Sequence, residues 1–133
     1  MKLDNNAHSV FLLNYHLVLV VKYRRKVFDA AISNRAKEIF ESIAPRYNIT
    51  LQECNHDCDH VHILFCGHPN TEISKFINAY KSASSRLLKQ EFPQIRQKLW
   101  QEKFWSQSFC LISAGGAPLA VLKNYIESQG ERS

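Results

Sequence analysis

The sequence lacks an apolar run long enough to cross a membrane. A transmembrane helix needs about 20 consecutive, mainly apolar residues, and the most apolar segment, residues 10–22, is interrupted by Asn14 and His16. The first six residues also lack the apolar stretch of a secretory signal. We therefore expect a cytoplasmic protein. Its 133 residues fit one domain spanning residues 1–133, without internal repeats or low-complexity segments.

Cysteine is also scarce, at four residues, and without a secretory signal we expect no disulfides. Three of the four cysteines lie close to several histidines: Cys54, His56, Cys58, His60, His62, Cys66 and His68. A structural zinc site is therefore an alternative. The spacing matches no common zinc finger, and ligands spread along a strand would be too far apart for one ion.

The chain is moderately basic, with 17 Lys and Arg residues against 12 Asp and Glu residues, a formal net charge of +5 and a pI of about 9.1. The basic residues form two groups: Lys22, Arg24, Arg25 and Lys26, and then Lys75, Lys81, Arg86 and Lys89 along a predicted helix. Phosphate backbones favour such groups through counterion release. A solvated surface explains the charge alone equally well.

Periodicity and breaker residues predict alternating strands and helices. The first half contains a long, largely buried strand at residues 10–22, a helix at 33–47 capped by Ser33, a strand beginning at 49–53 and a turn at 55–59. The second half contains a strand with His60 and His62 that stops at Gly67, a helix from Thr71 to before Pro93, a strand at 108–113, and a last helix from Pro118 to Gln129 with Gly130 as its stop. The order β-α-β-β-α-β plus one helix predicts an α+β, ferredoxin-like (RRM-like) antiparallel sheet with helices on one face.

Two histidines separated by one apolar residue stand in the segment Asp59-His60-Val61-His62-Ile63. Side chains alternate across a strand, so His60 and His62 share one face while Val61 lies on the other. Two imidazoles on a rigid strand can ligate one divalent metal ion. Hydrogen bonds alone also satisfy such a pair, so the pair is a weak signal by itself.

Tyr125 and Gln129 lie four residues apart in the last predicted helix and so share one helix face. A tyrosine hydroxyl, with a pKa near 10, is a weak nucleophile at neutral pH. It can attack a phosphodiester that a bound Mg²⁺ or Mn²⁺ polarises. Gln129 offers a carbonyl oxygen, and a ligand set of His60, His62 and Gln129 leaves coordination positions open, as catalytic metal sites do. This combination predicts single-strand DNA cleavage by a tyrosine.

With these motifs in place, the chain resembles the TnpA transposases of the insertion sequence 200/605 group, single-tyrosine members of the HUH (His-hydrophobe-His) nuclease superfamily. The matching segments are Asn14-Tyr15-His16-Leu17-Val18 with Lys22-Tyr23-Arg24-Arg25, Asp59-His60-Val61-His62-Ile63-Leu64, Lys81-Ser82-Ala83-Ser84-Ser85-Arg86-Leu87, Phe104-Trp105-Ser106-Gln107-Ser108-Phe109, and Asn124-Tyr125-Ile126-Glu127-Ser128-Gln129. Two departures, Cys58 where the family often has Pro and Phe109 where it usually has Tyr, do not touch the expected chemistry.

The resemblance implies excision and insertion of single-stranded DNA elements that carry subterminal hairpins. Tyr125 would form a 5′-phosphotyrosine link and release a 3′-OH, while His60, His62 and Gln129 hold Mg²⁺ or Mn²⁺. It also implies a homodimer, in which the flexible Gly115-Gly116 break lets the tyrosine helix pack against the partner's histidine pair.

Contacts with the DNA are expected from basic and aromatic side chains. The basic candidates are Lys22, Arg24, Arg25, Lys81, Arg86 and Lys89. Trp100, Phe104 and Trp105 either stack on unpaired bases or belong to the core or the dimer interface. His16 is a further candidate near the DNA, with a buried, hydrogen-bonded role as its alternative.

Two other functions stay open at this point. A repeat-hairpin-associated HUH nuclease would share the chemistry without moving an element. A non-catalytic single-strand nucleic-acid-binding module would need exposed aromatic residues on the sheet face, where the sequence instead places His60 and His62.

Overall fold

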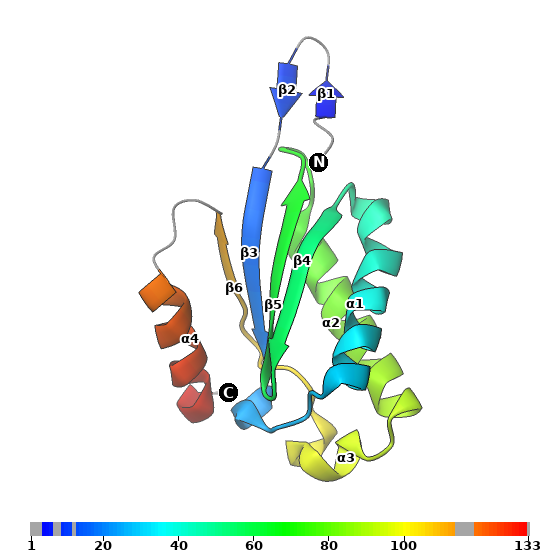
Figure 1. Cartoon of the computed structure of the whole chain (residues 1–133), viewed down its shortest axis with the longest axis vertical. Coiled ribbons are helices and arrows are strands. Elements are labelled where there is room, and N and C mark those ends of the chain that lie inside the picture. Colours follow the sequence, from blue (N-terminus) through cyan, green and yellow to red (C-terminus); the bar gives the residue numbers. More distant parts are fainter. Residues whose placement is uncertain (1–3, 7–8, 12, 114–118, 133) are drawn as a thin grey trace.

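A computed structural model describes residues 4–6, 9–11, 13–113 and 119–132, with the side chains of residues 13–113 and 123–129 (Figure 1). The strands are β1 (Asp4–Asn6), β2 (Ser9–Phe11), β3 (Leu13–Val20), β4 (Thr50–Asp57), β5 (His60–Gly67) and β6 (Cys110–Ser113). The α-helices are α1 (Ala30–Ile43), α2 (Ile73–Glu91), α3 (Ile95–Lys98) and α4 (Leu119–Arg132), and the short 3₁₀ turns are η1 (Lys22–Arg24), η2 (Ala44–Tyr47) and η3 (Trp100–Glu102).

Four strands form the main sheet in the order β4-β5-β3-β6, and every neighbouring pair is antiparallel. The unit β3-α1-β4 is split, because β5 lies between its two strands. This confirms the predicted ferredoxin-like arrangement. β1 and β2 pair separately as a small hairpin.

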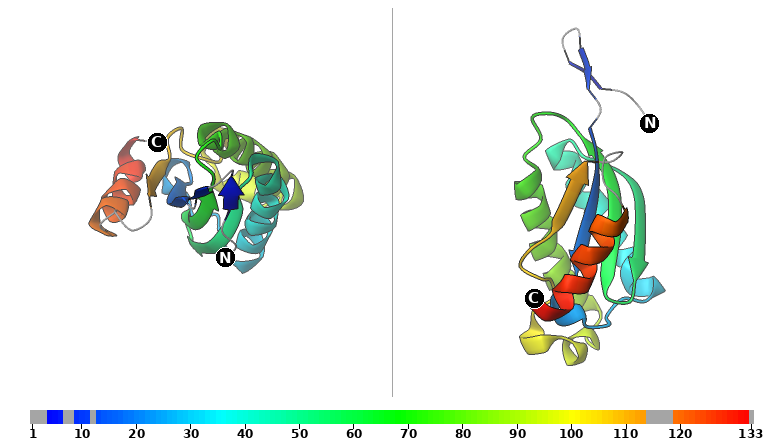
Figure 2. Two further views of the ribbon diagram at one scale, coloured as in Figure 1. Left: turned by 90° about the horizontal axis from the view of Figure 1, so that it is seen from above. Right: turned by 90° about the vertical axis from the view of Figure 1, so that its left-hand side faces the viewer.

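Helices α1 and α2 cover one face of the sheet, and α4 lies on the opposite face (Figure 2). Alternate residues of the central strands point toward α1 and α2, and the core there is largely apolar. Its fully buried members include Leu17, Leu19, Val61, Ile63 and Phe65 from the sheet, and Ile39, Phe40, Phe76, Ile77 and Tyr80 from the helices. On α2, Phe76 and Ile77 lie four and three residues before Tyr80, the spacing that puts side chains on one helix face.

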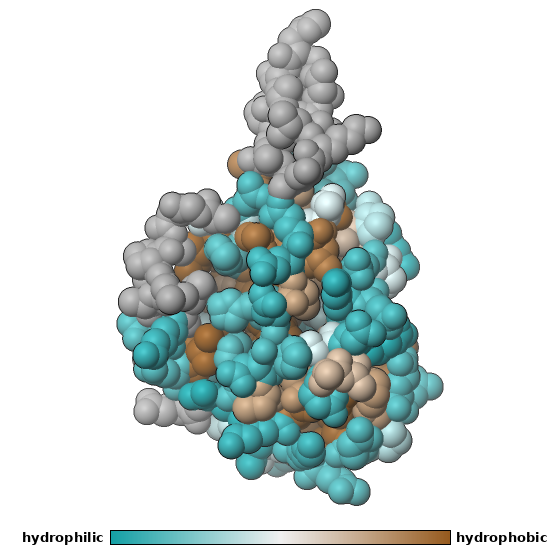
Figure 3. Space-filling model, viewed as in Figure 1, coloured by the Kyte–Doolittle hydropathy of each residue, from teal (hydrophilic) through white to brown (hydrophobic). Residues whose placement is uncertain are grey.

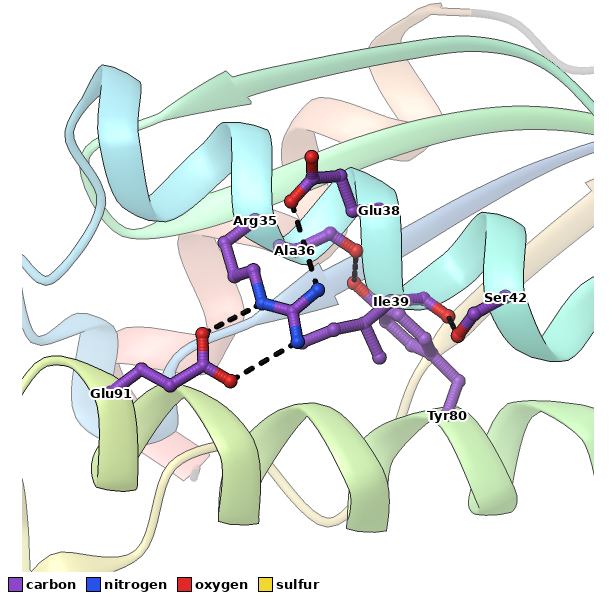
Figure 4. A network of polar contacts seen from close by, with 7 residues as sticks. All are labelled: Arg35, Ala36, Glu38, Ile39, Ser42, Tyr80 and Glu91. Atoms are coloured by element: carbon purple, nitrogen blue, oxygen red, sulfur yellow. Dashed lines mark hydrogen bonds and ion pairs between the residues drawn. The ribbon is translucent and has the colours of Figure 1, made fainter.

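Polar contacts also join α1 to α2 (Figure 4). The Arg35 guanidinium grips the Glu91 carboxylate with two hydrogen bonds, of 2.7 Å from Nε and 3.1 Å from a terminal nitrogen. The buried Tyr80 hydroxyl donates to the carbonyl oxygen of Ala36 at 3.0 Å. The two helices are thus held in register by directed bonds as well as by apolar burial.

The first half of the chain departs from the prediction at three places. The expected strand at 10–22 stops at Val20, and the chain turns through η1. The first helix begins three residues earlier than expected, because the Asp29 side chain, not Ser33, caps it by accepting from the Ile32 amide at 2.9 Å. The expected turn at 55–59 is a turn only at 58–59, since β4 continues through Asp57. Its polar residues suit an edge strand, whose pairing needs only the backbone.

The last helix runs past Gly130 to Arg132, so the predicted stop at Gly130 is wrong. A glycine inside a helix costs about 1 kcal/mol relative to alanine but does not end it by itself. Pro118 and the Gly115-Gly116 break lie outside the described residues. Of the helices that the structure describes, none combines the length and the apolar character that crossing a membrane requires.

Candidate active site

The histidine pair lies on the sheet face opposite α1 and α2. In the register of the sheet, His60 stands opposite Val20 of β3, and His62 stands opposite Val18. The two imidazole rings are neighbours, with centroids 5.6 Å apart. The alternation along β5 therefore aims both rings at one side, while Val61 between them is fully buried on the other.

Asp59 orients the first of these histidines. Its side chain is only 8% exposed, and its Oδ1 lies 2.6 Å from His60 Nδ1. Its Oδ2 accepts from Arg24 Nε at 2.9 Å. A carboxylate oxygen accepts a hydrogen bond from Nδ1 in this geometry, which leaves Nε2 as the His60 nitrogen that can face a ligand. A carboxylate behind an imidazole is the usual support of a metal-binding histidine.

Burial lowers the pKa of His62, and the neighbouring His60 and His16 lower it further. The neutral ring that results keeps a lone pair for a ligand. His62 and His16, with Glu53 and Asn55 of β4, line a small cavity of about 70 Å³. His16 therefore stands beside the predicted metal pair.

Tyr125 and Gln129 meet at Ser108, a residue just before β6. Ser108 Oγ donates to Gln129 Oε1 at 3.3 Å and lies 2.9 Å from the Tyr125 hydroxyl. Either hydroxyl can be the donor in the contact between Ser108 and Tyr125. Burial raises the pKa of Tyr125, while the bond to Ser108 acts in the opposite direction.

Sequence reasoning assigned no role to Ser108, although it stands in one of the matching segments. Nothing in its spacing to Tyr125, 17 residues away, reveals the contact. Arg24 and Asp59 gave no signal of their pairing for the same reason. The fold alone brings these residues together.

Packing on β3 and β6 holds α4 in place. Tyr125 and Ile126 contact a second, smaller cluster around the buried Val18 and Val20. The helix also contacts η1 of the same chain. Its C-terminal end, η1 and the start of β5 lie at the same end of the sheet (Figure 1). The two halves of the predicted site, β5 with its histidines and α4 with Tyr125 and Gln129, are thus connected through η1, whose Arg24 holds Asp59.

The donor set suits a divalent metal ion. His60 and His62 offer imidazole nitrogens, and Gln129 offers an amide oxygen, which also accepts from Ser108 Oγ. The structural-zinc alternative is less well supported by the positions of the cysteines. Cys54 stands opposite Ile63 in the register, so it points to the helix-covered face and away from His62. In the described parts of the chain, no three or more His, Cys, Asp or Glu side chains are grouped to hold a metal ion, and the four cysteines are free.

A groove of about 440 Å³ lies between α2 and the segment that follows η3. Of the six basic DNA-contact candidates, Lys22, Lys81 and Lys89 line it, together with Lys103, which the sequence did not single out. Lys81 Nζ donates to the carbonyl oxygens of Ser106 and Gln107 at 2.8 and 3.0 Å. Carbonyl oxygens leave its positive charge in place, although burial lowers the pKa of Lys81.

The remaining candidates lie elsewhere. Arg24 is engaged with Asp59, while Arg25 and Arg86 are exposed and do not line the groove. Of the aromatic candidates, Phe104 and Trp105 belong to the core. The Trp105 indole is fixed there by a 3.0 Å hydrogen bond to Ser84 Oγ.

Comparison with known proteins decides the family. The family model described as "Transposase IS200 like" matches residues 9–129. The chain belongs to the IS200-like transposases. This transposase is 33% identical, over 132 residues, to the ISDra2 transposase TnpA of Deinococcus radiodurans, a match that covers 99% of this chain and 94% of the relative. It is 27% identical over 125 residues to the transposase for insertion sequence element IS200 of Salmonella typhimurium, covering 94% of this chain and 82% of the relative.

Solved structures agree with the fold of the transposase. A putative transposase from Deinococcus radiodurans superposes with a TM-score of 0.85 at 30% identity, covering 95% of this chain and 97% of that one. A REP-associated tyrosine transposase bound to a REP hairpin superposes with a TM-score of 0.59 at 7% identity, covering 86% and 62% of the two chains. The second likeness concerns the fold alone. The resemblance to insertion sequence 200/605 transposases is thus confirmed.

Proposed function

We propose that this transposase cuts and rejoins single-stranded DNA with Tyr125 as its nucleophile. The observation that carries the proposal is the contact of Tyr125 and Gln129 with the same Ser108 hydroxyl. It aligns the predicted nucleophile and a predicted metal ligand on one face of α4. The helix ends beside the turn that supports His60 through Asp59.

The proposed reaction is a transesterification. Tyr125 Oη forms a bond to the phosphorus, and the bond from phosphorus to the 3′ oxygen breaks. The phenol loses its proton, and the departing 3′ oxygen gains one and becomes a 3′-OH. The strand downstream stays attached as a 5′-phosphotyrosine. Rejoining is the same exchange with a different 3′-OH, so neither water nor an external energy source is consumed.

The phenol begins this reaction protonated, because burial raises the pKa of Tyr125. Ser108 Oγ lies within hydrogen-bond distance of the Tyr125 hydroxyl, at 2.9 Å, and so is placed to accept the proton as it leaves. Asp59 engages Nδ1 of His60, so Nε2 is the nitrogen that would face the metal ion. His60, His62 and Gln129 would hold Mg²⁺ or Mn²⁺, an ion that polarises a bound phosphate and offsets the charge developing on its oxygens.

The DNA partner that we propose is a single strand with subterminal hairpins at the ends of an insertion sequence. Lys22, Lys81 and Lys89 line one groove, which suits a phosphate backbone. The REP-associated transposase, which shares the fold, was solved on a DNA hairpin, and this is consistent with the proposal. The site would work in a homodimer, as the resemblance implies.

A covalent-adduct assay tests the nucleophile. The protein is mixed with labelled single strands from the DNA flanking its own gene, with Mg²⁺ or Mn²⁺, and run on a denaturing gel. We expect labelled protein that disappears with Tyr125→Phe or with chelator, while hairpin binding persists. Tyr47→Phe is the matched control, because Tyr47 belongs to η2 and packs against Phe76 on the helix side. An adduct that survives in Tyr125→Phe would identify another nucleophile.

Mixing two inactive variants tests the dimer. In the structure, α4 packs against β3 of its own chain. If the tyrosine helix serves the partner's histidines, a heterodimer of Tyr125→Phe and His60→Ala contains one intact site and regains activity. If the helix serves its own histidines, each site keeps one defect and the mixture stays inactive. A monomer in sedimentation with DNA bound would contradict the dimer itself.

A further inference from the structure

Two short turns carry backbone strain. In η1, Tyr23 and Arg24 have φ values of 56° and 54°, and in η3, Gln101 and Glu102 have φ values of 50° and 59°. Left-handed conformations are costly for residues with a Cβ, and two in succession are unusual. Such strain persists only where the surrounding structure imposes it, and it gathers at binding and catalytic sites.

The strained turns hold two aromatic rings against each other. Tyr23 and Trp100 meet edge to face, with centroids 5.2 Å apart and planes at 80°. Tyr23 is 38% exposed, and among the side chains that the structure describes it is the exposed large hydrophobic one. A large ring held at the surface by a strained backbone contributes little to the core, so its position requires another explanation.

Cations surround this aromatic pair. Lys22 Nζ lies 5.4 Å from the Tyr23 ring centroid and 5.9 Å from that of Trp100. Lys103 Nζ lies 5.6 Å from the Trp100 ring. Aromatic faces beside lysines are the two components of a single-strand binding surface, in which bases stack and phosphates pair with cations.

The neighbours of Tyr23 in the chain connect this pair to both parts of the proposed site. Lys22, immediately before it, lines the basic groove. Arg24, immediately after it, bonds to Asp59, which holds His60. A strand whose backbone follows the groove and whose phosphate reaches the histidines would therefore pass η1.

We propose that Tyr23 and Trp100 form a stacking site for one unpaired base of the DNA strand next to the phosphate that is cut. The inference rests on the proposed function, since it assigns a position to that substrate. Stacking uses the face of the base and not its edge, so the site accepts any base but requires an unpaired one. The competing explanation is a clasp that only joins η1 to η3.

A double-mutant cycle with abasic DNA separates the two explanations. Binding is measured in chelator, without cleavage, for single strands from the flanking DNA that carry an abasic residue at successive positions. With the wild-type protein, we expect one position at which loss of the base weakens binding by about 5- to 150-fold, the range for one stacked base. With Tyr23→Ala, binding of the intact strand should fall similarly, and the abasic residue at that position should cause no further loss.

Matched variants keep the test independent of folding. Tyr23→Phe retains the ring and should bind like the wild type, and Trp100→Ala should show the same coupling to the same abasic position. Tyr47→Ala removes another tyrosine in an edge-to-face contact, whose ring centroid lies 5.5 Å from that of Phe76. This variant should leave the effect of the abasic residue unchanged. If Tyr23→Ala weakened the binding of every strand by the same factor, or did not weaken binding at all, the inference would be overturned and the clasp favoured. If the wild-type protein bound no strand, the proposed function itself would fail.

Discussion

The two faces of the main sheet are made from alternate residues of the same strands. One face packs into the apolar core, and the other carries the histidine pair. Toward α1 and α2, β5 presents Val61, Ile63 and Phe65, all within the apolar core. Toward the other side it presents His60 and His62. On that side Tyr125 and Ile126 of α4 pack against the cluster around Val18 and Val20. Seen as in Figure 1, with α4 at the left and α1 at the right, the surface shows many hydrophilic side chains with apolar patches between them (Figure 3).

This difference shows how a small domain separates stability from chemistry. Because the side-chain period of a strand is two, one segment can fill the core with its odd positions and carry ligands at its even ones. The histidines are then fixed by a rigid backbone without weakening the core. The comparison predicts that substitutions on the helix side lower stability, whereas substitutions on the α4 side change activity.

The largest effect on stability is expected for Phe76→Ala. Phe76 is fully buried and contacts the rings of Phe40 and Phe65. Its removal should lower the free energy of unfolding by about 3–5 kcal/mol. Ile126→Ala, on the α4 side, should cost only about 1 kcal/mol because that side chain is half-buried. Urea unfolding measures both. Equal losses would mean that α4 belongs to the same cooperative core.

The next effect concerns the carboxylate behind His60. Asp59→Asn keeps the size of the side chain but removes the negative charge that lies 2.6 Å from His60 Nδ1. We expect Mn²⁺ affinity to fall by about 10- to 100-fold, the usual cost of losing such a partner. Calorimetry with Mn²⁺ in a Tyr125→Phe background measures this without turnover.

Asp57→Asn is the control for that experiment. Asp57 stands opposite His60 in the register, but its Oδ1 accepts from the Cys58 amide at 2.7 Å. Asp57→Asn should therefore leave Mn²⁺ affinity nearly unchanged. Similar losses in both variants would point to general electrostatics and not to orientation of the imidazole.

Much of this organisation was predictable from the sequence because it depends on local patterns. The alternation around His60 and His62 predicted that both lie on one face of the sheet. The four-residue spacing of Tyr125 and Gln129 predicted that both lie on one face of the helix. The element order gave the split sheet. Local patterns also misplaced several boundaries, since the composition around Val20 and Asp57 does not reveal where backbone pairing ends.

The supporting contacts were not predictable. Arg24 and Asp59 are 35 residues apart, and Ser108 and Gln129 are 21 apart. Each contact forms because the strand order brings distant turns to one end of the sheet. No periodicity in the sequence encodes such a meeting, so these residues became visible only in the fold.

A smaller change of activity is expected for Ser108→Ala. It removes the hydroxyl that Tyr125 and Gln129 share, and a typical hydrogen bond contributes about 1 kcal/mol. We therefore expect adduct formation to slow by about fivefold, with hairpin binding intact. Ser108→Thr retains the hydroxyl and should restore most of the rate. Ser113→Ala, at the exposed end of β6, is the control. An unchanged rate in Ser108→Ala would remove Ser108 from the site.

The smallest effect belongs to the ion pair between α1 and α2 (Figure 4). The hydrogen bonds from Arg35 lower the pKa of Glu91, and the bond to Glu91 raises the pKa of Arg35. A carboxylate with a lowered pKa in the folded state stabilises the fold fully above its unfolded pKa, about 4.3. That stabilisation is lost as the pH falls through the lower, folded value.

The stability difference between the wild type and Glu91→Gln should therefore be largest near neutral pH and vanish in acid. Both side chains are about one-third exposed, so salt should weaken the effect. Urea unfolding from pH 3 to 7, with Arg35→Gln and the double variant completing a cycle, isolates the pair from the contact of Arg35 with Glu38. A coupling that stays constant with pH would mean that the two helices are held together by packing and the Tyr80 hydrogen bond, and that the charge of Glu91 contributes nothing.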